Sequence, residues 1–321
     1  MSLTQSLLAM GGGVLLLLAG AEALVRGASA LALRVGITPL VVGLTVVAIG
    51  TSSPELVVSV QAALAGQGGV AIGNVVGSNI ANLGLIVGLA AVLSPMAIDR
   101  KLVRHDMPVM LVAMGLLVVF LLDGVLARWE GGVLLAGAVL YTVEGITTSR
   151  REVRAARTAE VLPEVEAAMA DANAGFKRHL LFVVGGVALL VYGSELLLDG
   201  AIAAATRLGV SEAVVGLTLV ALGTSLPELA TTIVAARRGE GDIALGNAVG
   251  SNIFNVLSVL GPAALAAPVA SAGVGGDVLG IMVGVSVLTL VFLITGGRTR
   301  RWEGGLLLLA YAAYVWYILP H

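Results

Sequence analysis

The sequence contains no cysteine, few charged residues and no phosphate-binding motif. The absence of cysteine from all 321 residues excludes disulfides, thiolate metal sites and thiol nucleophiles. No Gly-x-Gly-x-x-Gly or P-loop sequence occurs, so ATP hydrolysis is not supported. Only 12% of the residues are charged, against about 25% in soluble domains. Since 58% are hydrophobic and lie in continuous runs, the composition predicts a polytopic α-helical membrane protein rather than a β-barrel.

The first apolar segment resembles a signal peptide in part. Leu15–Leu18 is apolar, and the Ala19-Gly20-Ala21 that follows resembles a cleavage site. A signal peptide also has a basic region at its start, which this segment lacks. Because the segment has an internal counterpart later in the chain, we expect it to stay as the first transmembrane helix.

The chain is an internal duplication. The stretch from Ala48 to Glu55, Ala-Ile-Gly-Thr-Ser-Ser-Pro-Glu, returns as Ala-Leu-Gly-Thr-Ser-Leu-Pro-Glu from Ala221 to Glu228. The shift between the copies is 173 residues, and ten of seventeen positions are identical between 44–60 and 217–233. The same shift relates Trp129 to Trp302, so the duplication covers most of each half.

Each half contains five apolar runs of about the length needed to cross a membrane. They are residues 5–25, 38–65, 70–93, 106–125 and 130–147 in the first half, and 180–198, 211–236, 243–266, 275–295 and 303–319 in the second. An odd number of spans per half turns the second half upside down. The predicted fold is therefore an all-α membrane protein with ten transmembrane helices in two inverted five-helix repeats, residues 1–147 and 180–321, joined by a connector at 148–179.

The basic residues test this count. With loops alternating between the two sides, sixteen of the eighteen Lys and Arg residues fall on one side, and only Arg128 and Arg207 fall on the other. The positive-inside rule makes the rich side cytoplasmic. We therefore expect a multi-pass protein of the plasma or inner membrane with both termini outside, and a polar cytoplasmic connector whose residues 150–170 can form an amphipathic helix.

The repeated Gly-Thr-Ser-x-Pro-Glu stretch predicts a broken helix with a carboxylate at the break. Pro54 has no N–H to donate and disfavours helical geometry at Ser53, yet it suits the first turn of a new helix. An unwound joint at 51–53 frees backbone carbonyls and places Glu55 in the first turn of the second half-helix. Carbonyls, hydroxyls and carboxylates are the hard oxygen ligands preferred by Ca²⁺ and Na⁺. The candidate residues in the two copies are Ala48, Thr51, Ser52 and Glu55, and Ala221, Thr224, Ser225 and Glu228.

A second repeated motif, Gly-Asn-x-x-Gly-Ser-Asn, follows each joint. Ser78 and Asn82 lie four residues apart and so share one helix face, as do Ser251 and Asn255. We expect these four neutral side chains to face the two glutamates. The other asparagines of the motifs, Asn74, Asn79, Asn247 and Asn252, are interpreted as helix-packing residues.

Two carboxylates at membrane depth require a compensating cation, because each buried charge costs several kcal/mol. The residues alone therefore predict an antiporter that binds Ca²⁺ and Na⁺ between Glu55 and Glu228. Other polar residues have ordinary interpretations: Glu22 with Arg26 forms a helical ion pair, and Trp129 and Trp302 anchor helix starts at the membrane interface.

At these two pairs of motifs the chain resembles the cation/calcium exchanger superfamily, in particular its prokaryotic sodium/calcium exchanger branch. The resemblance implies cation sites between the second, third, seventh and eighth helices. It implies that Glu55 and Glu228 ligate Ca²⁺ together with the carbonyls of Thr51 and Thr224. It also implies two groups of Na⁺ ligands, which are Ala48, Ser52, Ser78 and Glu228, and Ala221, Ser225, Ser251 and Glu55. Ca²⁺ and Na⁺ are then transported substrates, with no cofactor, no nucleic acid and no protein partner indicated besides the lipid bilayer.

Some positions separate this chain from other branches. Asn255 stands where some relatives, including potassium-dependent ones, carry Asp, so K⁺ co-transport is not expected. Proton/calcium exchangers usually carry Glu where this chain has Ser78 and Ser251, which favours Na⁺ coupling, although an H⁺/Ca²⁺ antiporter of the same fold stays open.

Two further alternatives belong to other classes. An intramembrane hydrolase would need a base near Ser52 or Ser225, and none is expected there. The histidines His105, His179 and His321 are predicted in loops or at the terminus, which argues against a proton relay or zinc site. A channel is disfavoured by the inverted, near-neutral paired sites. The sequence thus predicts a transporter and not an enzyme.

Overall fold

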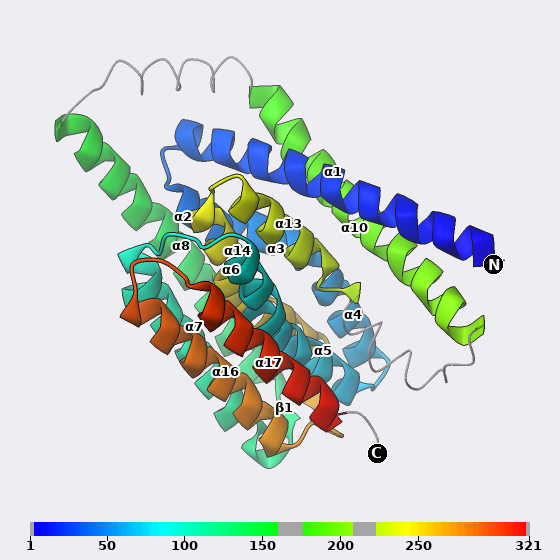
Figure 1. Cartoon of the computed structure of the whole chain (residues 1–321). Coiled ribbons are helices and arrows are strands. Elements are labelled where there is room, and N and C mark those ends of the chain that lie inside the picture. The colour runs from blue at the N-terminus through cyan, green and yellow to red at the C-terminus, as the bar shows by residue number, and fades with distance from the viewer. Residues whose placement is uncertain (1–2, 160–175, 208–222, 319–321) are drawn as a thin grey trace.

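The structure, a computed structural model, describes residues 3–159, 176–207 and 223–318. Nearly all of these residues are helical (Figure 1), and η marks short π-helical or 3-10 turns. The first half contains α1 (Leu3–Val35), α2 (Pro39–Val42), η1 (Gly43–Val47), α3 (Ala48–Thr51), α4 (Ser53–Leu64), α5 (Gly68–Ala81), η2 (Asn82–Val87), α6 (Gly88–Leu93), η3 (Leu102–Asp106), α7 (Met107–Phe120), η4 (Leu121–Asp123), β1 (Val125–Leu126) and α8 (Arg128–Ala159). The second contains α10 (Phe176–Arg207), α13 (Leu226–Arg237), α14 (Gly241–Phe254), η6 (Asn255–Val259), α15 (Leu260–Ala266), β2 (Val269–Ala270), α16 (Gly276–Thr295) and α17 (Arg301–Ile318).

The helices are long and apolar enough for a membrane protein. Within the described residues, seven helices satisfy the length and hydropathy of a membrane span, and a bent pair makes an eighth. That pair is 39–51 with 53–64, whose axes differ by 49°. The chain is therefore a multi-pass membrane protein. The predicted span at 211–236 lies partly outside the described residues.

The helices α1 and α10 form a pair along one side of the bundle (Figure 1). Glycine recurs at every seventh position on both faces in contact, and the glycines are Gly13, Gly20 and Gly27 in α1 and Gly186, Gly193 and Gly200 in α10. A Cβ added to Gly20 would lie 2.8 Å from the Gly186 carbonyl oxygen, and the reverse substitution would give the same distance. Small residues therefore let the two backbones touch.

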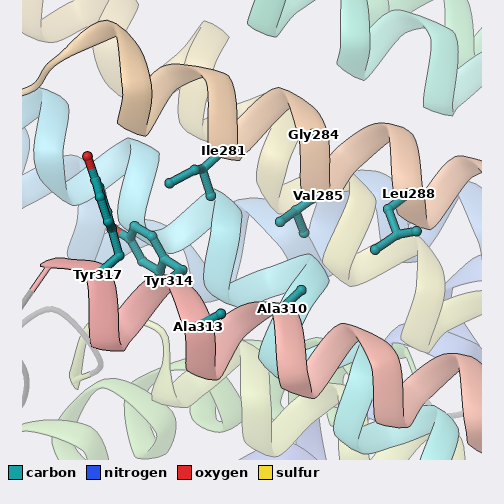
Figure 2. A pocket seen from close by; sticks show the side chains of 8 residues that line it. All are labelled: Ile281, Gly284, Val285, Leu288, Ala310, Ala313, Tyr314 and Tyr317. Carbon is teal, nitrogen blue, oxygen red and sulfur yellow. The ribbon is translucent and has the colours of Figure 1, made fainter.

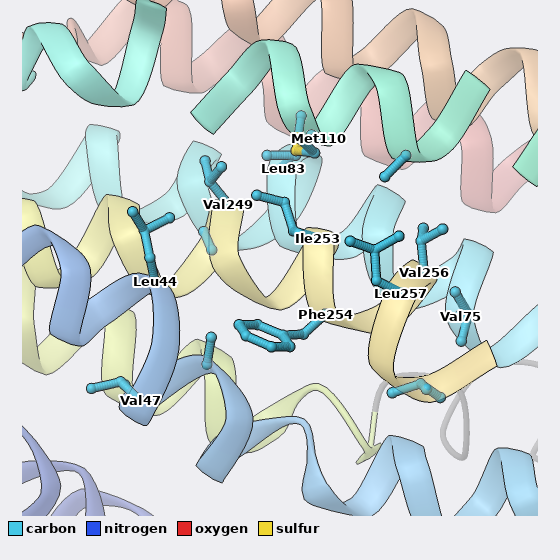
Figure 3. Packing of buried hydrophobic residues seen from close by; sticks show 14 of the residues in the cluster. Leu44, Val47, Val75, Leu83, Met110, Val249, Ile253, Phe254, Val256 and Leu257 are labelled. Atoms are coloured by element: carbon cyan, nitrogen blue, oxygen red, sulfur yellow. The ribbon is translucent and has the colours of Figure 1, made fainter. Parts of the chain in front are cut away.

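The innermost part of the bundle is built from the segments 68–93 and 241–266. Of the seven candidate spans they are the most buried, since 78% and 94% of their most apolar 18-residue windows are buried inside the structure. Their apolar side chains, such as Leu83, Val249 and Ile253, interlock with Leu44 and Met110 from neighbouring helices (Figure 3). This packed layer surrounds the polar residues of the second motif and holds their backbones in place.

Contacts between the halves come in reciprocal pairs. Val125 pairs with Ala270 in the β1–β2 ladder, and Ala97 pairs with Arg298 in a bridge whose residues are the same positions shifted by 173. The two backbone pairings between loops of different halves are therefore equivalent under the duplication. The helix starts repeat as well, since Glu130 accepts the Ala127 N–H and Glu303 accepts the Arg300 N–H, each at 2.7 Å. These are capping interactions of the same kind in each half.

Three features differ from the sequence prediction. The helices α1 and α10 extend over 33 and 32 residues, well beyond the predicted runs 5–25 and 180–198, because their polar ends continue the same helix. Helix α8 continues past residue 147 to Ala159, so residues 150–159 are helical as expected but continue the fifth span instead of forming a separate helix, and the rest of the expected helix at 150–170 lies outside the described residues. Hydrophobic periodicity also gave no sign of the π-helical turns, which insert one extra residue into a turn without changing composition.

Candidate functional site

The two motif glutamates occupy equivalent places in the structure. Glu55 lies in the first turn of α4 and Glu228 in the first turn of α13, and both are fully buried. Proline at the helix start precedes each of them, as predicted. The two carboxylates are near enough for the charge of Glu228 to act on Glu55. The duplicated motif therefore brings two carboxyl groups together inside the bundle.

The helix break before Glu55 is narrower than predicted. Only Ser52, with φ −83° and ψ 10°, leaves helical geometry between α3 and α4. Backbone hydrogen bonds continue on both sides, from the Ser52 N–H to the Ala48 carbonyl at 2.9 Å and from the Leu56 N–H to the Ser52 carbonyl at 3.2 Å. Pro54 has no N–H for the Gly50 carbonyl, which is enough to bend the helix.

The Ala48 carbonyl is already engaged. It accepts the Ser52 N–H and, at 3.3 Å, the Thr51 hydroxyl. The expectation of a free carbonyl at Ala48 therefore does not hold in this structure, because a one-residue break keeps that backbone bond. Its counterpart Ala221 lies outside the described residues.

Hydroxyls from one half face the motif residues of the other half. Ser52 donates to Oε1 of Glu228 at 2.9 Å, and Ser225 donates to the hydroxyl of Ser78 at 3.1 Å. The Ser78 and Thr224 hydroxyls lie beside the Glu55 carboxylate. Glu228 in turn has Thr51, Ser52 and Ser251 beside it. The structure thus gathers around the two glutamates the hydroxyls that the sequence singled out.

Asn74 and Asn247 join these parts in a way that the sequence did not reveal. Asn247 accepts the Thr51 hydroxyl at 3.2 Å and donates to the Thr232 hydroxyl at 3.0 Å and the Glu228 carbonyl at 3.4 Å. Asn74 makes the same three contacts in the other half, with the Thr224 hydroxyl at 3.3 Å, the Ser59 hydroxyl at 3.0 Å and the Glu55 carbonyl at 3.4 Å.

Each of these two asparagines therefore ties the joint of one half to the carboxylate helix of the other. This function goes beyond the packing role expected for them. Each asparagine lies more than 140 positions from the threonine whose hydroxyl it accepts, so no local pattern links the two. The only signal in the sequence was that both copies of the motif contain the asparagine.

Several buried oxygens in this region have no hydrogen-bond partner among the described residues. They are both carboxylate oxygens of Glu55, Oε2 of Glu228, the Ser251 hydroxyl, and Oδ1 of Asn82 and Asn255. No ion pair from a Lys, Arg or His reaches either glutamate within the described part of the chain. An uncompensated buried charge costs several kcal/mol, so this arrangement calls for cations. Carboxylate, hydroxyl and amide oxygens suit hard cations such as Ca²⁺ and Na⁺.

The described histidines and the ion pair predicted from the sequence do not join this cluster. Over the described residues, no three His, Cys, Asp or Glu side chains gather as a metal site. His105 lies in η3 and His179 lies in α10. The prediction that both lie in loops is therefore wrong. Glu22 and Arg26 form the predicted ion pair at 2.6 Å. Trp129 and Trp302 are exposed at the second positions of α8 and α17, as expected for interfacial anchors.

A separate cavity of about 450 Å³ lies between α16 and α17 (Figure 2). Its lining is almost entirely apolar, with Ile281, Val285 and Leu288 on one side and Tyr314 and Tyr317 on the other. A cavity of this chemistry does not suit a cation. The polar cluster at the two glutamates is therefore the candidate ion site.

Comparisons with known proteins agree with this geometry. The sequence model of the sodium/calcium exchanger protein family matches residues 5–144 and 178–319. The sodium/calcium exchanger MaX1 of Methanosarcina acetivorans is 35% identical over 333 aligned positions, covering 94% of this chain and 95% of MaX1. The inner membrane protein YrbG of Escherichia coli is 40% identical over 258, covering 80% of this chain and 78% of YrbG. A structure of the sodium-calcium exchanger NCX_Mj, soaked with Na⁺ and without Ca²⁺, superposes with a TM-score of 0.85 at 31% identity, covering 99% of this chain and all of that one.

Proposed function

Because the chain belongs to the sodium/calcium exchanger family, we propose that it is a secondary active antiporter that exchanges Na⁺ for Ca²⁺ across the membrane. The family consists of transporters rather than enzymes. The observation that carries the proposal is the pair of fully buried glutamates, which have unpartnered oxygens and, within the described residues, no ion pair with a basic side chain. Two ionised carboxylates in such a pair need a compensating positive charge, which a bound cation can supply.

Charge balance explains why the two ions compete. Two carboxylates neutralise one Ca²⁺ or two of several Na⁺, so the same pocket cannot hold a full complement of both. A filled site is nearly neutral and can be enclosed, whereas an empty site resists enclosure because two bare charges would lose water. This penalty favours exchange over leak.

We assign the ligands in two groups. Glu55 and Glu228, with the carbonyls of Thr51 and Thr224, hold Ca²⁺. Na⁺ is held by oxygens around the same glutamates, from Ser52 and Ser78 in one half and from Ala221, Ser225 and Ser251 in the other. The Ala48 carbonyl is left out of this set, because it already accepts two hydrogen bonds. The amide oxygens of Asn82 and Asn255, which are buried and unpartnered in the described structure, complete the neutral ligands.

The proposed topology is ten helices in two inverted repeats, with a cytoplasmic connector and both termini outside. The reciprocal loop contacts support it, since β1 and β2 fall on the same predicted side and Ala97 and Arg298 on the other. Relatives include an inner membrane protein, which supports the plasma or inner membrane as the location. In alternating access, the α1–α10 pair is our candidate for the part that moves against the remaining bundle.

The test is uptake of radiolabelled Ca²⁺ into proteoliposomes loaded with Na⁺, at fixed pH. We expect uptake only while an outward Na⁺ gradient exists, and no uptake in empty liposomes. Uptake that ignores Na⁺ and follows a pH gradient would instead establish the H⁺/Ca²⁺ alternative, and the Na⁺ ligands would be withdrawn. Uptake that needs no gradient of either ion would indicate a channel.

A further inference from the structure

Four asparagines at the centre of the bundle form two interlocked chains of hydrogen bonds. Asn79 and Asn82 come from the first half, Asn252 and Asn255 from the second, and all four are at most 1% exposed. Asn82 and Asn255 each begin a π-helical turn, η2 and η6. Turns of this kind often mark functional positions, because they change the direction of the side chain.

In the first chain of hydrogen bonds, the order of donors and acceptors fixes the orientation of each side-chain amide. The Asn79 backbone carbonyl can only accept, and it accepts Nδ2 of Asn252 at 3.2 Å. The Asn252 amide is therefore fixed with Oδ1 on its other side, where it accepts Nδ2 of Asn82 at 2.9 Å. Asn82 must then point Oδ1 away from Asn252, and this oxygen is buried without a partner in the described structure.

The second chain repeats the first in the opposite direction. The Asn252 carbonyl accepts Nδ2 of Asn79 at 3.4 Å, and Oδ1 of Asn79 accepts Nδ2 of Asn255 at 3.0 Å. Oδ1 of Asn255 is left buried and unpartnered in the same part of the structure. Helix contacts place η2 against α13, which carries Glu228, and η6 against α4, which carries Glu55.

We infer that Asn79 and Asn252 are positioning residues, which orient the amides of Asn255 and Asn82 so that oxygen rather than NH₂ faces the cation site. Reversal of the Asn82 amide would place its oxygen against Oδ1 of Asn252, and reversal of the Asn255 amide would place its oxygen against Oδ1 of Asn79. Either reversal would also turn a partly positive NH₂ towards the ion. This inference rests on the proposed function. It assigns to Asn79 and Asn252 a specific role in ion affinity, in place of general helix packing.

A double-mutant cycle on the full-length purified chain tests the inference, with equilibrium binding of radiolabelled Ca²⁺ as the measurement. Asn252→Ala should weaken Ca²⁺ binding about tenfold, as expected when a polar ligand to a charged group is withdrawn. In an Asn82→Ala background the same substitution should change the dissociation constant less than about twofold, because the amide through which it acts is gone. In an Asn255→Ala background it should keep its full effect.

Asn255 is the matched control, since it lies three residues from Asn252 on the same helix but belongs to the other chain. A packing role for Asn252 predicts equal effects in both backgrounds, and that result would overturn the inference. In Na⁺-driven uptake we also expect a higher KM for Ca²⁺ with the maximal rate nearly unchanged. If Asn252→Ala does not fold, the cycle is run on Asn79 with Asn255, and Asn82 becomes the control.

The wild-type chain separates this inference from the proposed function. Ca²⁺ binding by the wild type with effects that are specific to the predicted partner supports both. Ca²⁺ binding with additive effects in both backgrounds removes the positioning role alone. A wild type that binds neither Ca²⁺ nor Na⁺ removes the proposed function, and the inference with it.

Discussion

The Ser52 hydroxyl donates a 2.9 Å hydrogen bond to Oε1 of Glu228, although the two residues lie 176 positions apart. The equivalent hydroxyl of Ser225 does not contact Glu55 in this way and donates to Ser78 instead. The two halves of the site are therefore not identical. Glu228 has one partnered oxygen, whereas Glu55 has none within the described residues.

Removal of the Ser52 hydroxyl should weaken Na⁺ use more than Ca²⁺ use. Ser52→Ala leaves Glu228 without its donor and takes away a Na⁺ ligand, at a cost of about 0.5–1.5 kcal/mol, or roughly 2–10-fold in affinity. The measurement is the Na⁺ dependence of Ca²⁺ uptake. Ser53→Ala is the matched control, because the Ser53 hydroxyl donates to the Ile49 carbonyl of its own helix at an exposed position and contacts neither glutamate. Equal effects of the two substitutions would contradict the assignment.

Neutralisation of either motif glutamate should abolish Ca²⁺ transport. Glu55→Gln or Glu228→Gln leaves one negative charge for a divalent ion, so the filled site keeps a net charge that resists enclosure. The readout is Na⁺-driven Ca²⁺ uptake, normalised to the amount of folded protein. Glu303→Gln provides the control, since Glu303 is also buried but caps α17, and glutamine can still accept the Arg300 N–H. Retained Ca²⁺ flux in Glu55→Gln would remove this residue from the site.

Arg238 should help to hold α1 against the rest of the bundle. It pairs with Glu22 of α1 at 2.5 Å, and Glu22 also pairs with Arg26. These groups are partly exposed, so the pair contributes at most about 1 kcal/mol, and less at high salt. We expect Arg238→Gln to accelerate hydrogen exchange in the second half of α1 at low salt only. Arg237→Gln, an exposed neighbour, should have no effect.

This contact has no counterpart in the other half. The position equivalent to Arg238 is Ala65, whereas Glu22 has the acidic counterpart Glu195. Helix α1 packs along α13, whereas α10 makes little contact with α4. Faster exchange in both long helices of Arg238→Gln would show that the ion pair does not act locally.

The predicted orientation can be tested with single cysteines, because the natural chain has none. Asp123 and Arg151 are both exposed. Asp123 lies near the predicted outer end of the span 106–125, and Arg151 lies in the predicted cytoplasmic connector. An impermeant thiol reagent applied to intact cells should label Asp123→Cys directly. Arg151→Cys should react only after permeabilisation. The reverse pattern would invert the topology, and equal labelling would contradict the helix count between these positions.

The sequence alone predicted the membrane class, the duplication and the broken helix at Glu55. These features depend on composition, on identity at a fixed shift and on a proline, all of which can be read from the order of the residues alone. The family assignment is confirmed by the match over both halves. The ion ligands themselves stay predictions.

What the sequence could not reveal depends on contacts between distant residues. No local pattern shows that Thr51 meets Asn247, or that Ser52 meets Glu228 rather than Glu55. Asn74 and Asn247 were therefore interpreted as packing residues, although each connects a joint to a carboxylate helix. The full length of α1 and α10 was also missed, because a polar helix end has the same composition as a loop.

The central claim is that Na⁺ and Ca²⁺ compete for one cluster formed by Glu55 and Glu228. Equilibrium binding of radiolabelled Ca²⁺ to the purified chain at increasing Na⁺ tests it most directly. The account predicts a single Ca²⁺ that Na⁺ displaces completely, and no Ca²⁺ binding in Glu228→Gln. Ca²⁺ that stays bound at saturating Na⁺ would mean separate sites and would contradict the account.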